Sequence, residues 1–469
     1  MSTDVVAADA AVPELVGRRV AVLGLGLSGA AALAALAGTG VEAVVAVDTR
    51  DTDAVRASGE RARARGATVH LGCTDPAVLD GCDLAVTSPG LPLAHPLLAG
   101  ALARGLEVWS EPELAWRRAS GRTQLVAITG TNGKTTTTEL AAACLDAPAG
   151  GNLGPPLCGL LAVTEPPPTV VAELSSFQLR FSATLRAHVG VLLNLAPDHL
   201  DWHPDLADYA ASKARVWANQ QGEDAAVIFV DDAGARQVRA THPPPARVVP
   251  VTLAAPPRGG VGVAEDTLVA RLPHAEGPIA ALADLPSDEP AFLADAACAA
   301  AAALIAGADR STVGARLAAF RPGPHRLEEV AVRRGVRWIN DSKATNPHAA
   351  ASALAAHPSV VWIAGGLLKG LSLDALGELL PDRVRLVLAI GEGAQAVADL
   401  AARAQVPVRH AGTIAEAVPL AAQHAEPGDT VLLSPAAASF DQFASYAARG
   451  EAFRDAVAAL DDPAREGAR

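Results

Sequence analysis

One arrangement recurs along the whole 469-residue chain: a short run of β-branched and other apolar residues ends in a polar or glycine-rich turn. Longer, alanine-rich segments with the composition of helices separate these runs. Strands that alternate with helices form largely parallel sheets, and such sheets bind ligands at the carboxyl ends of their strands. We therefore expect each polar turn to lie at such an end. The main runs are "RRVAVLGLG", "QLVAITG", "TVVAELSS", "HVGVLLNLAPDH", "VRWINDSKATN", "SVVWIAGGLLKG", "RLVLAIGEG" and "DTVLLSPAAASFDQF".

The runs fall into three blocks, which predict an α/β protein of three domains. Residues 1–113 form a Rossmann-like domain, and residues 114–322 form a central P-loop domain with a mostly parallel sheet. Within the central block, 243–290 is rich in Pro and Gly and has the pattern of short strands and loops. The segment "FRPGPHRLEEV" is predicted to be a linker, because Pro and Gly break helices. Residues 323–469 then form a second Rossmann-like domain.

The first block opens on "GLGLSG" (24–29), which fits G-x-G-x-x-G after a strand, with Asp48 closing the next strand. This pattern alone predicts a dinucleotide-binding turn. Any tight strand-to-helix turn that approaches a diphosphate needs the same glycines, however. A different diphosphate ligand is therefore favoured over NAD(P), and a purely structural turn is the third reading.

The most specific motif is "TGTNGKTTT" (129–137), which follows the strand "LVAIT" and opens a helix. Backbone N–H groups of such a loop cradle phosphates, Lys134 reaches the β and γ oxygens, and the Thr135 hydroxyl touches Mg²⁺. The loop is shorter than the usual G-x-x-x-x-G-K-[ST], because Gly130 and Gly133 are only three positions apart. It predicts a nucleotide site of a P-loop subset, with a structural turn as the alternative.

Two further strand ends offer groups that could hold magnesium. Glu173 ends "TVVAE", and a carboxylate beside the P-loop would be a suitable oxygen ligand, although a lone acid at a strand end is often only exposed. The segment "NLAPDHLDWH" offers His199 and His203. A single histidine is more often structural than a ligand, and His203 is assigned to that structural class.

Composition excludes several classes of function. A formal charge of −13 argues against a nucleic-acid or anionic-membrane surface. The N-terminal stretch is acidic and lacks the basic and apolar regions of a signal peptide. The apolar run 294–308 is too short to cross a bilayer and is predicted to be a buried helix. The five cysteines show no C-x-x-C pair and are expected to be buried thiols in a reducing cytoplasm.

Lysine is rare in this chain: of 38 basic Lys and Arg residues, only Lys134, Lys213, Lys343 and Lys369 are lysines. On a solvated surface arginine serves almost as well, but it cannot supply a compact primary amine that loses its proton or reacts. Chance survival would explain any one of the four. All four lie in conspicuous motifs, which indicates that the chemistry of an amine matters there.

The ordered set "GTNGKT", "ELSSFQL", "NLAPDHLDWH", "SKAR", "PHRLE", "NDSKATN", "GGLLKG" and "LLSPAAASFDQF" resembles the Mur ligase family along nearly the whole chain. The P-loop and the "DH" motif are shared by all Mur ligases and by folylpolyglutamate synthases. "ELSSFQL", "NDSKATN" and the "SPA…SFDQF" segment resemble the members that add D-glutamate. The resemblance implies a cytoplasmic enzyme, expected to be monomeric, that joins UDP-N-acetylmuramoyl-L-alanine to D-glutamate with ATP and Mg²⁺ through an acyl phosphate.

The resemblance also implies roles for individual residues. Lys213 corresponds to a carbamylated lysine that, with Thr135, Glu173 and His199, holds magnesium, and Lys134, His199, Lys213 and Lys343 are the catalytic set. Three binding sets follow. The ATP set is Gly130, Thr131, Asn132, Gly133, Lys134, Thr135, Thr136, Arg326 and Asp341; the UDP-substrate set is Leu27, Ser28, Asp48, Thr49, Arg50, Ser88, Pro89, Gly90 and Asn152; the D-glutamate set is Thr345, Lys369, Ser439, Phe440 and Tyr446.

Three positions in two motifs depart from the family pattern, and three rival functions remain. Leu367 and Leu368 stand where some relatives have Asp and Gly, and Tyr446 stands where Phe is common. The nearest rival is another Mur ligase or a folylpolyglutamate synthase, but the latter lacks a separate UDP-binding domain. The second rival hypothesis, a nicotinamide-dependent oxidoreductase, does not explain why the chain has a P-loop and why its four lysines lie in motifs. A P-loop regulatory protein leaves Lys213 unexplained.

Overall fold

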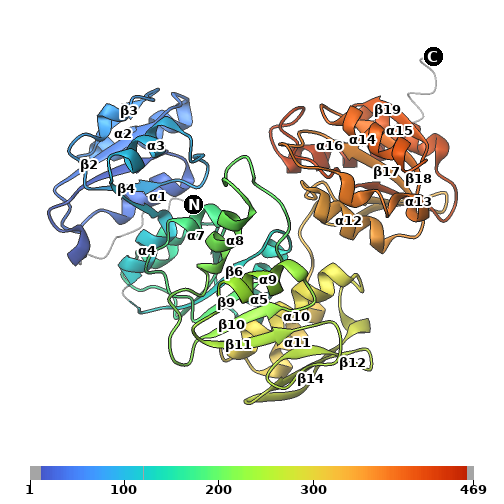
Figure 1. Cartoon of the computed structure of the whole chain (residues 1–469), viewed down its shortest axis with the longest axis horizontal. Coiled ribbons are helices and arrows are strands. Elements are labelled where there is room, and N and C mark those ends of the chain that lie inside the picture. The colour runs from blue at the N-terminus through green and yellow to red at the C-terminus, as the bar shows by residue number, and fades with distance from the viewer. Residues whose placement is uncertain (1–11, 120, 462–469) are drawn as a thin grey trace. The chain divides into compact units, whose positions relative to one another are not determined.

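The computed structural model describes residues 12–119 and 121–461, and its strands form three sheets (Figure 1). The predicted three-domain α/β architecture is confirmed. By packing, the chain divides into two units. The first, residues up to 195, 202–288 and 292–320, contains the first two sheets. The second, 196–201, 289–291 and residues from 321 onward, contains the third. The predicted domain boundaries at 113 and 322 stay predictions.

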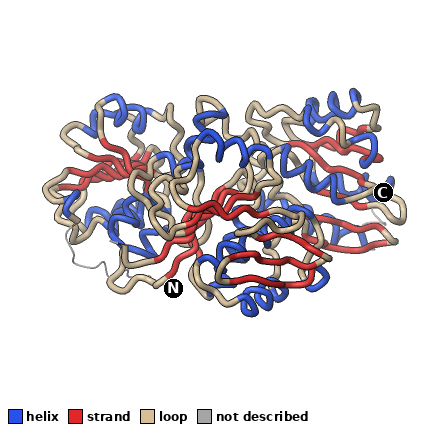
Figure 2. The backbone as a smooth tube through the Cα atoms, turned by 60° about the horizontal axis from the view of Figure 1, so that its bottom comes forward, coloured by secondary structure: helices blue, strands red, loops and turns tan. Residues whose placement is uncertain are grey.

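The first sheet is entirely parallel, with the order β3-β2-β1-β4-β5 that is typical of doubly wound folds. Its central strands are buried along most of their length because helices cover the sheet (Figure 2). The strands are β1 (Arg19–Leu23), β2 (Ala43–Asp48), β3 (Thr68–Leu71), β4 (Leu84–Thr87) and β5 (Glu107–Ser110); the helices are α1 (Leu27–Ala35), α2 (Asp53–Ala64), α3 (Pro96–Ala103) and α4 (Glu111–Ala119).

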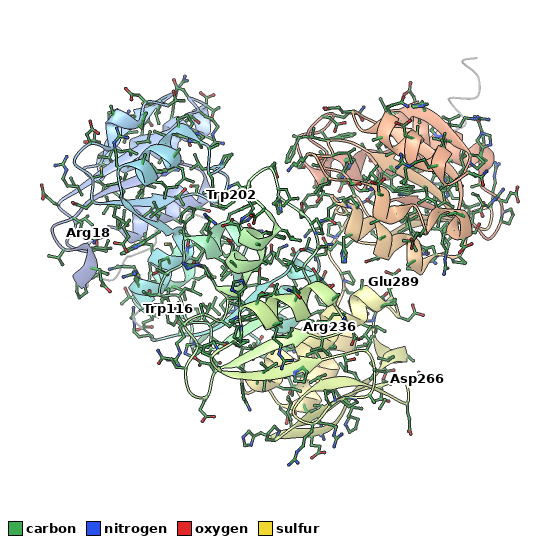
Figure 3. All side chains as sticks on the ribbon, viewed as in Figure 1. Arg18, Trp116, Trp202, Arg236, Asp266 and Glu289 are labelled. Atoms are coloured by element: carbon green, nitrogen blue, oxygen red, sulfur yellow. The ribbon has the colours of Figure 1, made fainter. Side chains whose placement is uncertain are left out.

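The second sheet has nine strands in the order β14-β13-β12-β11-β10-β9-β6-β8-β7. It is parallel from β7 to β12, and β12, β13 and β14 pair antiparallel. The Pro- and Gly-rich stretch therefore supplies the sheet's antiparallel edge. Glu265 and Asp266 make the turn between β12 and β13 with φ of 48° and 55° (Figure 3). The strands are β6 (Gln124–Thr129), β7 (Ala149–Gly151), β8 (Thr169–Glu173), β9 (Val189–Leu192), β10 (Ala225–Phe229), β11 (Arg247–Val251), β12 (Val261–Ala264), β13 (Thr267–Leu272) and β14 (Ala275–Ala281).

The helices beside the second sheet can pack closely against it because many of their buried residues are small. In α10 (Pro290–Ile305), the eight residues 296–303 are alanines and one cysteine, all fully buried against the sheet. The predicted buried helix is confirmed. The other helices of this sheet are α5 (Lys134–Leu145), α6 (Leu157–Leu161), α7 (Ser176–Arg180), α8 (Leu206–Ala214), α9 (Ala233–Thr241) and α11 (Arg310–Ala319).

The third sheet has the order β15-β16-β20-β17-β18-β19, with β15 antiparallel and all other pairs parallel. Its strands are β15 (Glu328–Arg333), β16 (Val336–Asn340), β17 (Val360–Gly365), β18 (Val384–Ile390), β19 (Val408–Gly412) and β20 (Thr430–Leu433); its helices are α12 (Pro347–Ala356), α13 (Leu380–Arg383), α14 (Ala394–Arg403), α15 (Ile414–His424) and α16 (Tyr446–Ala458). The polar motifs follow the carboxyl ends of β16, β17 and β20, as predicted.

One expectation about the thiols is wrong. Cys82, Cys144, Cys158 and Cys298 are buried, but Cys73 is partly exposed, because it follows the short edge strand β3 in a loop. Among the described residues, no helix is both long and apolar enough to span a bilayer.

Candidate active site

The predicted phosphate-binding loop connects β6 to the N-terminus of α5. Gly133 has φ of 82°, and a Cβ there would lie only 2.1 Å from Oδ1 of Asp295 on α10, so only glycine fits. Asn194, which follows β9, holds the loop from the neighbouring strand end: its Oδ1 accepts the N–H groups of Thr131 and Asn132, both at 2.9 Å. The loop is thereby fixed at the start of a helix, where N–H groups and the helix dipole favour an anion.

Two of the four lysines meet at one carbonyl of this loop. Lys134 Nζ donates to the carbonyl oxygens of Gly130 at 2.9 Å and Thr131 at 2.8 Å. Lys213, at the end of α8, donates from Nζ to the same Gly130 oxygen at 2.7 Å and is only 1% exposed. Its Nζ also lies 4.5 Å from the centre of the Tyr209 ring, whose hydroxyl is 3.2 Å from Thr131 Oγ1. Lys213, which lies 79 positions beyond Lys134 in the sequence, therefore contacts the same loop from α8.

Glu173, the last residue of β8, is 3% exposed beside this loop's strand. Asn152 Nδ2 donates to its Oε1 at 2.7 Å, and the Asn152 N–H donates to the Glu173 carbonyl at 2.8 Å. Within the described chain, the other carboxylate oxygen, Oε2, is buried without a hydrogen-bond partner. A buried carboxylate oxygen is costly unless something compensates it, so this atom suits a cation.

Among the residues that the structure describes, no three His, Cys, Asp or Glu side chains cluster so that they could hold a metal ion. The predicted set of Thr135, Glu173, His199 and Lys213 combines a hydroxyl, a carboxylate, an imidazole and an amine. Thr135 lies in the first turn of α5, and Glu173 lies on the strand beside β6.

The residues of the first sheet that are predicted to bind the UDP substrate lie after β1, β2 and β4. Asp48 Oδ2 accepts the Leu25 N–H at 2.7 Å, and both its oxygens bind the Arg50 guanidinium, at 3.1 and 3.0 Å. Burial raises the pKa of Asp48, but these hydrogen bonds outweigh it, and its pKa lies below the ordinary value. Ser88 Oγ donates to the Gly24 carbonyl at 3.3 Å, which joins two of the predicted turns. Leu27, at the start of α1, is 80% exposed.

The remaining members of this set lie in the same turns: Ser28 is in the first turn of α1, Thr49 lies between Asp48 and Arg50, and Pro89 and Gly90 follow Ser88. Trp202 extends this region toward the central sheet, because its Nε1 donates to the Leu91 carbonyl at 2.9 Å (Figure 3). His203 is buried between Asp208, at 2.6 Å, and Ser176, at 2.9 Å. Its structural assignment is confirmed.

His199 belongs to the second unit by packing. It has a left-handed φ of 54°, and its N–H donates to Asp198 Oδ1 at 2.8 Å. The second oxygen of Asp198 accepts from Asn346 Nδ2 at 3.0 Å. Asn346 also caps α12, so this hydrogen bond joins "NLAPDH" to "NDSKATN". The predicted approach of His199 to the magnesium ligands of the first unit stays a prediction.

Asp341 follows β16 in the second unit and is buried. Burial raises its pKa to about 7, and hydrogen bonds from the Ser434 hydroxyl at 2.7 Å and the Leu327 N–H at 3.3 Å oppose that rise. Arg326 precedes Leu327 in the segment between α11 and β15. The structure thus brings the start of "NDSKATN" and the end of the linker together, although their contacts with a nucleotide stay predictions.

Three of the predicted D-glutamate residues take part in two cation–ring pairs, one of them with Lys343 of the predicted catalytic set. Lys369 Nζ lies 5.5 Å from the centre of the Phe440 ring, and Lys343 Nζ lies 5.6 Å from that of Tyr446. Ser439, next to Phe440, is buried. The loops meet because Leu367 and Ala438 exchange two backbone hydrogen bonds of 2.8 and 3.0 Å. The departure at Leu367 and Leu368 therefore leaves Lys369 beside the Phe440 loop. Thr345 lies two residues after Lys343 in the same turn.

Two positioning residues were missed. Asn194 lies in a quoted motif, and its place directly after a strand next to the P-loop strand was the available signal. Arg449 of α16 is buried and donates to Ser342 Oγ at 3.0 Å, the Ser342 carbonyl at 2.8 Å and the Ala437 carbonyl at 3.0 Å. Burial lowers its pKa to about 10. It joins the "NDSKATN" and "SPAAASFDQF" loops, but nothing distinguishes it in the sequence from the many other arginines.

Comparisons with known proteins agree with this geometry. The family profiles described as "Mur ligase MurD-like, N-terminal domain", "Mur ligase middle domain" and "Mur ligase, glutamate ligase domain" match residues 18–110, 128–256 and 325–437. A protein of Frankia casuarinae named "UDP-N-acetylmuramoylalanine--D-glutamate ligase" is 45% identical, over 95% of both chains. A protein of Thermobifida fusca with the same name is 44% identical, over 95% of this chain and 99% of its own.

Solved structures share the fold at low sequence identity. A pseudomurein peptide ligase type C from Methanothermus fervidus superposes with a TM-score of 0.58 at 17% identity, covering 95% of this chain and all of its own. The MurF ligase from Thermotoga maritima in complex with ADP has a TM-score of 0.55 at 15% identity, covering 89% of this chain and 94% of its own. These structures support the three-domain fold.

Proposed function

The chain belongs to the Mur ligase family, and we propose that it joins D-glutamate to UDP-N-acetylmuramoyl-L-alanine in peptidoglycan precursor synthesis. One observation carries the chemistry: Lys134 and Lys213 both bind the Gly130 carbonyl of a phosphate-binding loop. The choice of substrates is supported by the relatives at 45% and 44% identity, which carry the name of this ligase over almost their whole length.

The reaction has two steps. A carboxylate oxygen of the UDP-linked substrate attacks the γ-phosphorus of ATP, the bond to the bridging oxygen breaks, and ADP leaves. The amine nitrogen of D-glutamate then attacks the carbonyl carbon of the acyl phosphate and loses a proton, and the tetrahedral intermediate expels phosphate to leave an amide. Negative charge develops on phosphoryl oxygens, so the fixed N–H groups of the loop and the Lys134 ammonium stabilise the first transition state.

Mg²⁺ is the cofactor that ATP chemistry of this kind uses, and when bound it would neutralise charge on the phosphate oxygens. Thr135, Glu173, Lys213 and His199 would hold it. The buried, unpartnered Oε2 of Glu173 in the described chain fits that role, because a cation would compensate it. Asn152 fixes the other oxygen of the same carboxylate and would link the metal position to the UDP-substrate site.

Lys213 would serve as a carbamate. A neutral lysine amine attacks the carbon of dissolved CO₂ and loses a proton, which leaves a carboxylate on a long side chain. The exposed fraction of 1% and the contact with the Gly130 carbonyl are the observations that support it. A guanidinium cannot react in this way.

The second unit would bind the incoming amino acid. Lys369 would meet a carboxylate of D-glutamate, with Thr345, Ser439, Phe440 and Tyr446 around it. Arg326, Asp341 and Lys343 would reach the nucleotide and the transferred phosphoryl group. The turns of the first sheet, with Asp48 and Ser88 at their centre, would hold the uridine diphosphate. We further propose that the enzyme acts as a monomer in the cytoplasm, with small-molecule substrates as its partners.

A substrate panel tests the proposal. ADP release and amide product are measured with UDP-N-acetylmuramoyl-L-alanine and D-glutamate, each alone and together, and with L-glutamate, L-alanine or meso-diaminopimelate as the amine. Sustained ADP release should require both substrates. None of the other amines should replace D-glutamate. A preference for another amine would assign the chain to a different Mur ligase. NADH that binds the "GLGLSG" turn in place of the UDP substrate would overturn the assignment of the first domain.

A further inference from the structure

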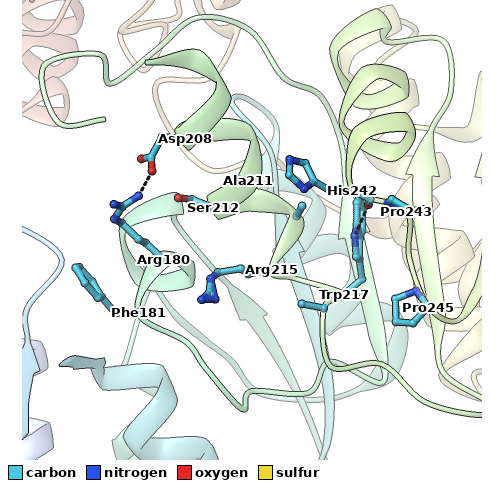
Figure 4. Close-up of a pocket in the computed structure, with 12 residues that line it drawn as sticks. Arg180, Phe181, Asp208, Ala211, Ser212, Arg215, Trp217, His242, Pro243 and Pro245 are labelled. Carbon is cyan, nitrogen blue, oxygen red and sulfur yellow. Dashed lines mark hydrogen bonds and ion pairs between the residues drawn. The ribbon is translucent and has the colours of Figure 1, made fainter. Parts of the chain in front are cut away.

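A groove of about 810 Å³ lies on the central domain, away from the phosphate-binding loop (Figure 4). The end of α7, one side of α8 and the segment after α9 form its walls. Its volume falls in the range of small-molecule sites, which is roughly 300–1,000 Å³. Lys213 and Tyr209, which contact the P-loop from α8, are not among its lining residues. The groove is therefore a feature separate from the catalytic site.

The charge of the groove is carried by arginine. Arg180 is paired with Asp208, and His203 binds the same carboxylate, so this part is neutral overall. Arg215 also lines the groove and is only partly buried. No hydrogen bond or ion pair of its guanidinium occurs within the part of the chain that the structure describes. The one carboxylate among the lining residues, Asp208, is already paired with Arg180, so the Arg215 head group is suited to bind a phosphate or carboxylate ligand in a bidentate manner.

Most of the other lining residues are apolar. Phe181, Trp217, Pro243 and Pro245 line the groove together with His242 (Figure 4). Trp217 Nε1 donates to the His242 carbonyl at 3.1 Å, which fixes this wall to the end of α8. Trp217 itself is only 2% exposed, so the contact area for a planar or apolar group comes from Phe181, Pro243 and Pro245, at little cost in side-chain entropy. The groove thus combines an arginine that makes no ion pair within the described residues with apolar side chains.

We propose that this groove is a second ligand site, which binds a small anion that carries a flat apolar group. A phosphate monoester and a carboxylate share the chemistry that Arg215 would recognise. The proposal does not depend on the ligase activity, because none of the lining residues has a role in the site described above.

The test uses the full-length protein with ADP, Mg²⁺ and the UDP-linked substrate at saturating concentrations, so that the P-loop and the first-domain site are filled. Calorimetric titration with 1-naphthyl phosphate should show one saturable site. 1-Naphthoate replaces the phosphate by a carboxylate and tells which anion is preferred. Inorganic phosphate lacks the ring and 1-naphthylmethanol lacks the charge, so each should bind at least about 10-fold more weakly, as expected when a charge-assisted hydrogen bond or the apolar contact is lost.

Variants locate the site. Arg215→Ala should weaken binding of 1-naphthyl phosphate at least about 10-fold, as loss of a charge-assisted contact predicts. Arg239→Ala on the exposed face of α9 removes the same charge nearby and should leave binding unchanged. Ala218→Phe fills the groove from an exposed lining position, so it tests the site even if Arg215→Ala impairs folding. Three results would overturn the proposal. They are the absence of saturable binding, competition with ADP, and an affinity for 1-naphthyl phosphate that is the same in the Arg215→Ala variant, the Ala218→Phe variant and the parent protein.

Discussion

Asn152 and Glu173 are joined by a 2.7 Å hydrogen bond that engages one oxygen of a buried carboxylate, and the other oxygen has no partner in the described chain. The two residues were assigned to different ligands, Asn152 to the UDP-linked substrate and Glu173 to magnesium. Their contact means that the loop after β7 and the end of β8 share one polar centre. A disturbance of the substrate loop should therefore also be felt at the metal position.

Glu173→Gln should raise the Mg²⁺ concentration for half-maximal ligase activity by about 10- to 100-fold, the range for disturbed metal sites. Glutamine keeps an acceptor for Asn152 but loses the negative charge that faces the cation. The measurement is the Mg²⁺ dependence of ADP release at saturating substrates. Glu165→Gln, an exposed residue between α6 and β8, is the matched control. Equal Mg²⁺ dependence in both variants and the parent would show that Glu173 holds no metal.

Lys213→Arg should lose about as much activity as Lys213→Ala, roughly 100-fold or more, because neither side chain can form a carbamate. Added short carboxylic acids should partly restore the alanine variant by placing an oxygen pair where the carbamate was. The rates of ADP release decide it: a near-normal arginine variant would mean that Lys213 acts only as a cation.

Lys369→Ala should raise the KM for D-glutamate by roughly 10- to 150-fold, which corresponds to one charge-assisted hydrogen bond of about 1.5–3 kcal/mol. The KM values for ATP and the UDP-linked substrate should move much less. Arg409→Ala, on the exposed edge strand β19 of the same sheet, is the control. If the KM for ATP rises while that for D-glutamate is unchanged, Lys369 belongs to the nucleotide site.

Glu111 should make stability depend on pH. Burial raises its pKa to about 7, opposed by hydrogen bonds from the Cys158 and Leu157 backbone and the Cys158 thiol. Because the folded-state pKa exceeds the unfolded value, the folded state holds the proton more tightly. Glu111 therefore contributes favourably to the free energy of unfolding at low pH. This contribution is lost as the pH rises from about 4.5 to about 7. At about 1.4 kcal/mol per pKa unit, the loss reaches about 3 kcal/mol.

Glu111→Gln stays neutral at every pH and should remove this dependence. Urea unfolding at pH 5 and pH 8 measures it: the variant should match the parent near pH 5 and exceed it by up to about 3 kcal/mol at pH 8. The same stability difference at both pH values would mean that the carboxyl group of Glu111 does not titrate in this range.

Much of this arrangement could be predicted from the sequence. The short loop with Lys134 and the strand-end position of Glu173 follow local rules, since the turn chemistry and the parallel sheet fix where these side chains lie. The rarity of lysine singled out Lys213, but its distance from Lys134 in the sequence gave no reason why both should reach Gly130. That contact depends on how α8 packs, which no local pattern encodes.

Other features could not be predicted from the sequence, because they too depend on tertiary packing. Arg449 acts through burial, and burial depends on how α16 lies against two loops from distant parts of the chain. The exposure of Cys73 depends on the length of an edge strand, which local propensity determines poorly. The antiparallel edge formed by β13 and β14 was visible only as a change in Pro and Gly content, because pairing partners are set by the whole sheet.

The transfer of oxygen from the carboxylate to phosphate tests the central claim most directly. UDP-N-acetylmuramoyl-L-alanine labelled with ¹⁸O in its carboxylate is incubated with ATP, Mg²⁺ and D-glutamate, and the released phosphate is analysed by mass spectrometry. Formation of an acyl phosphate beside Lys134 and Lys213 predicts one ¹⁸O in each phosphate, one amide product per ADP, and unlabelled ADP. Unlabelled phosphate, which would reveal attack by water on ATP, or label in AMP, which would reveal an acyl adenylate, would contradict the account.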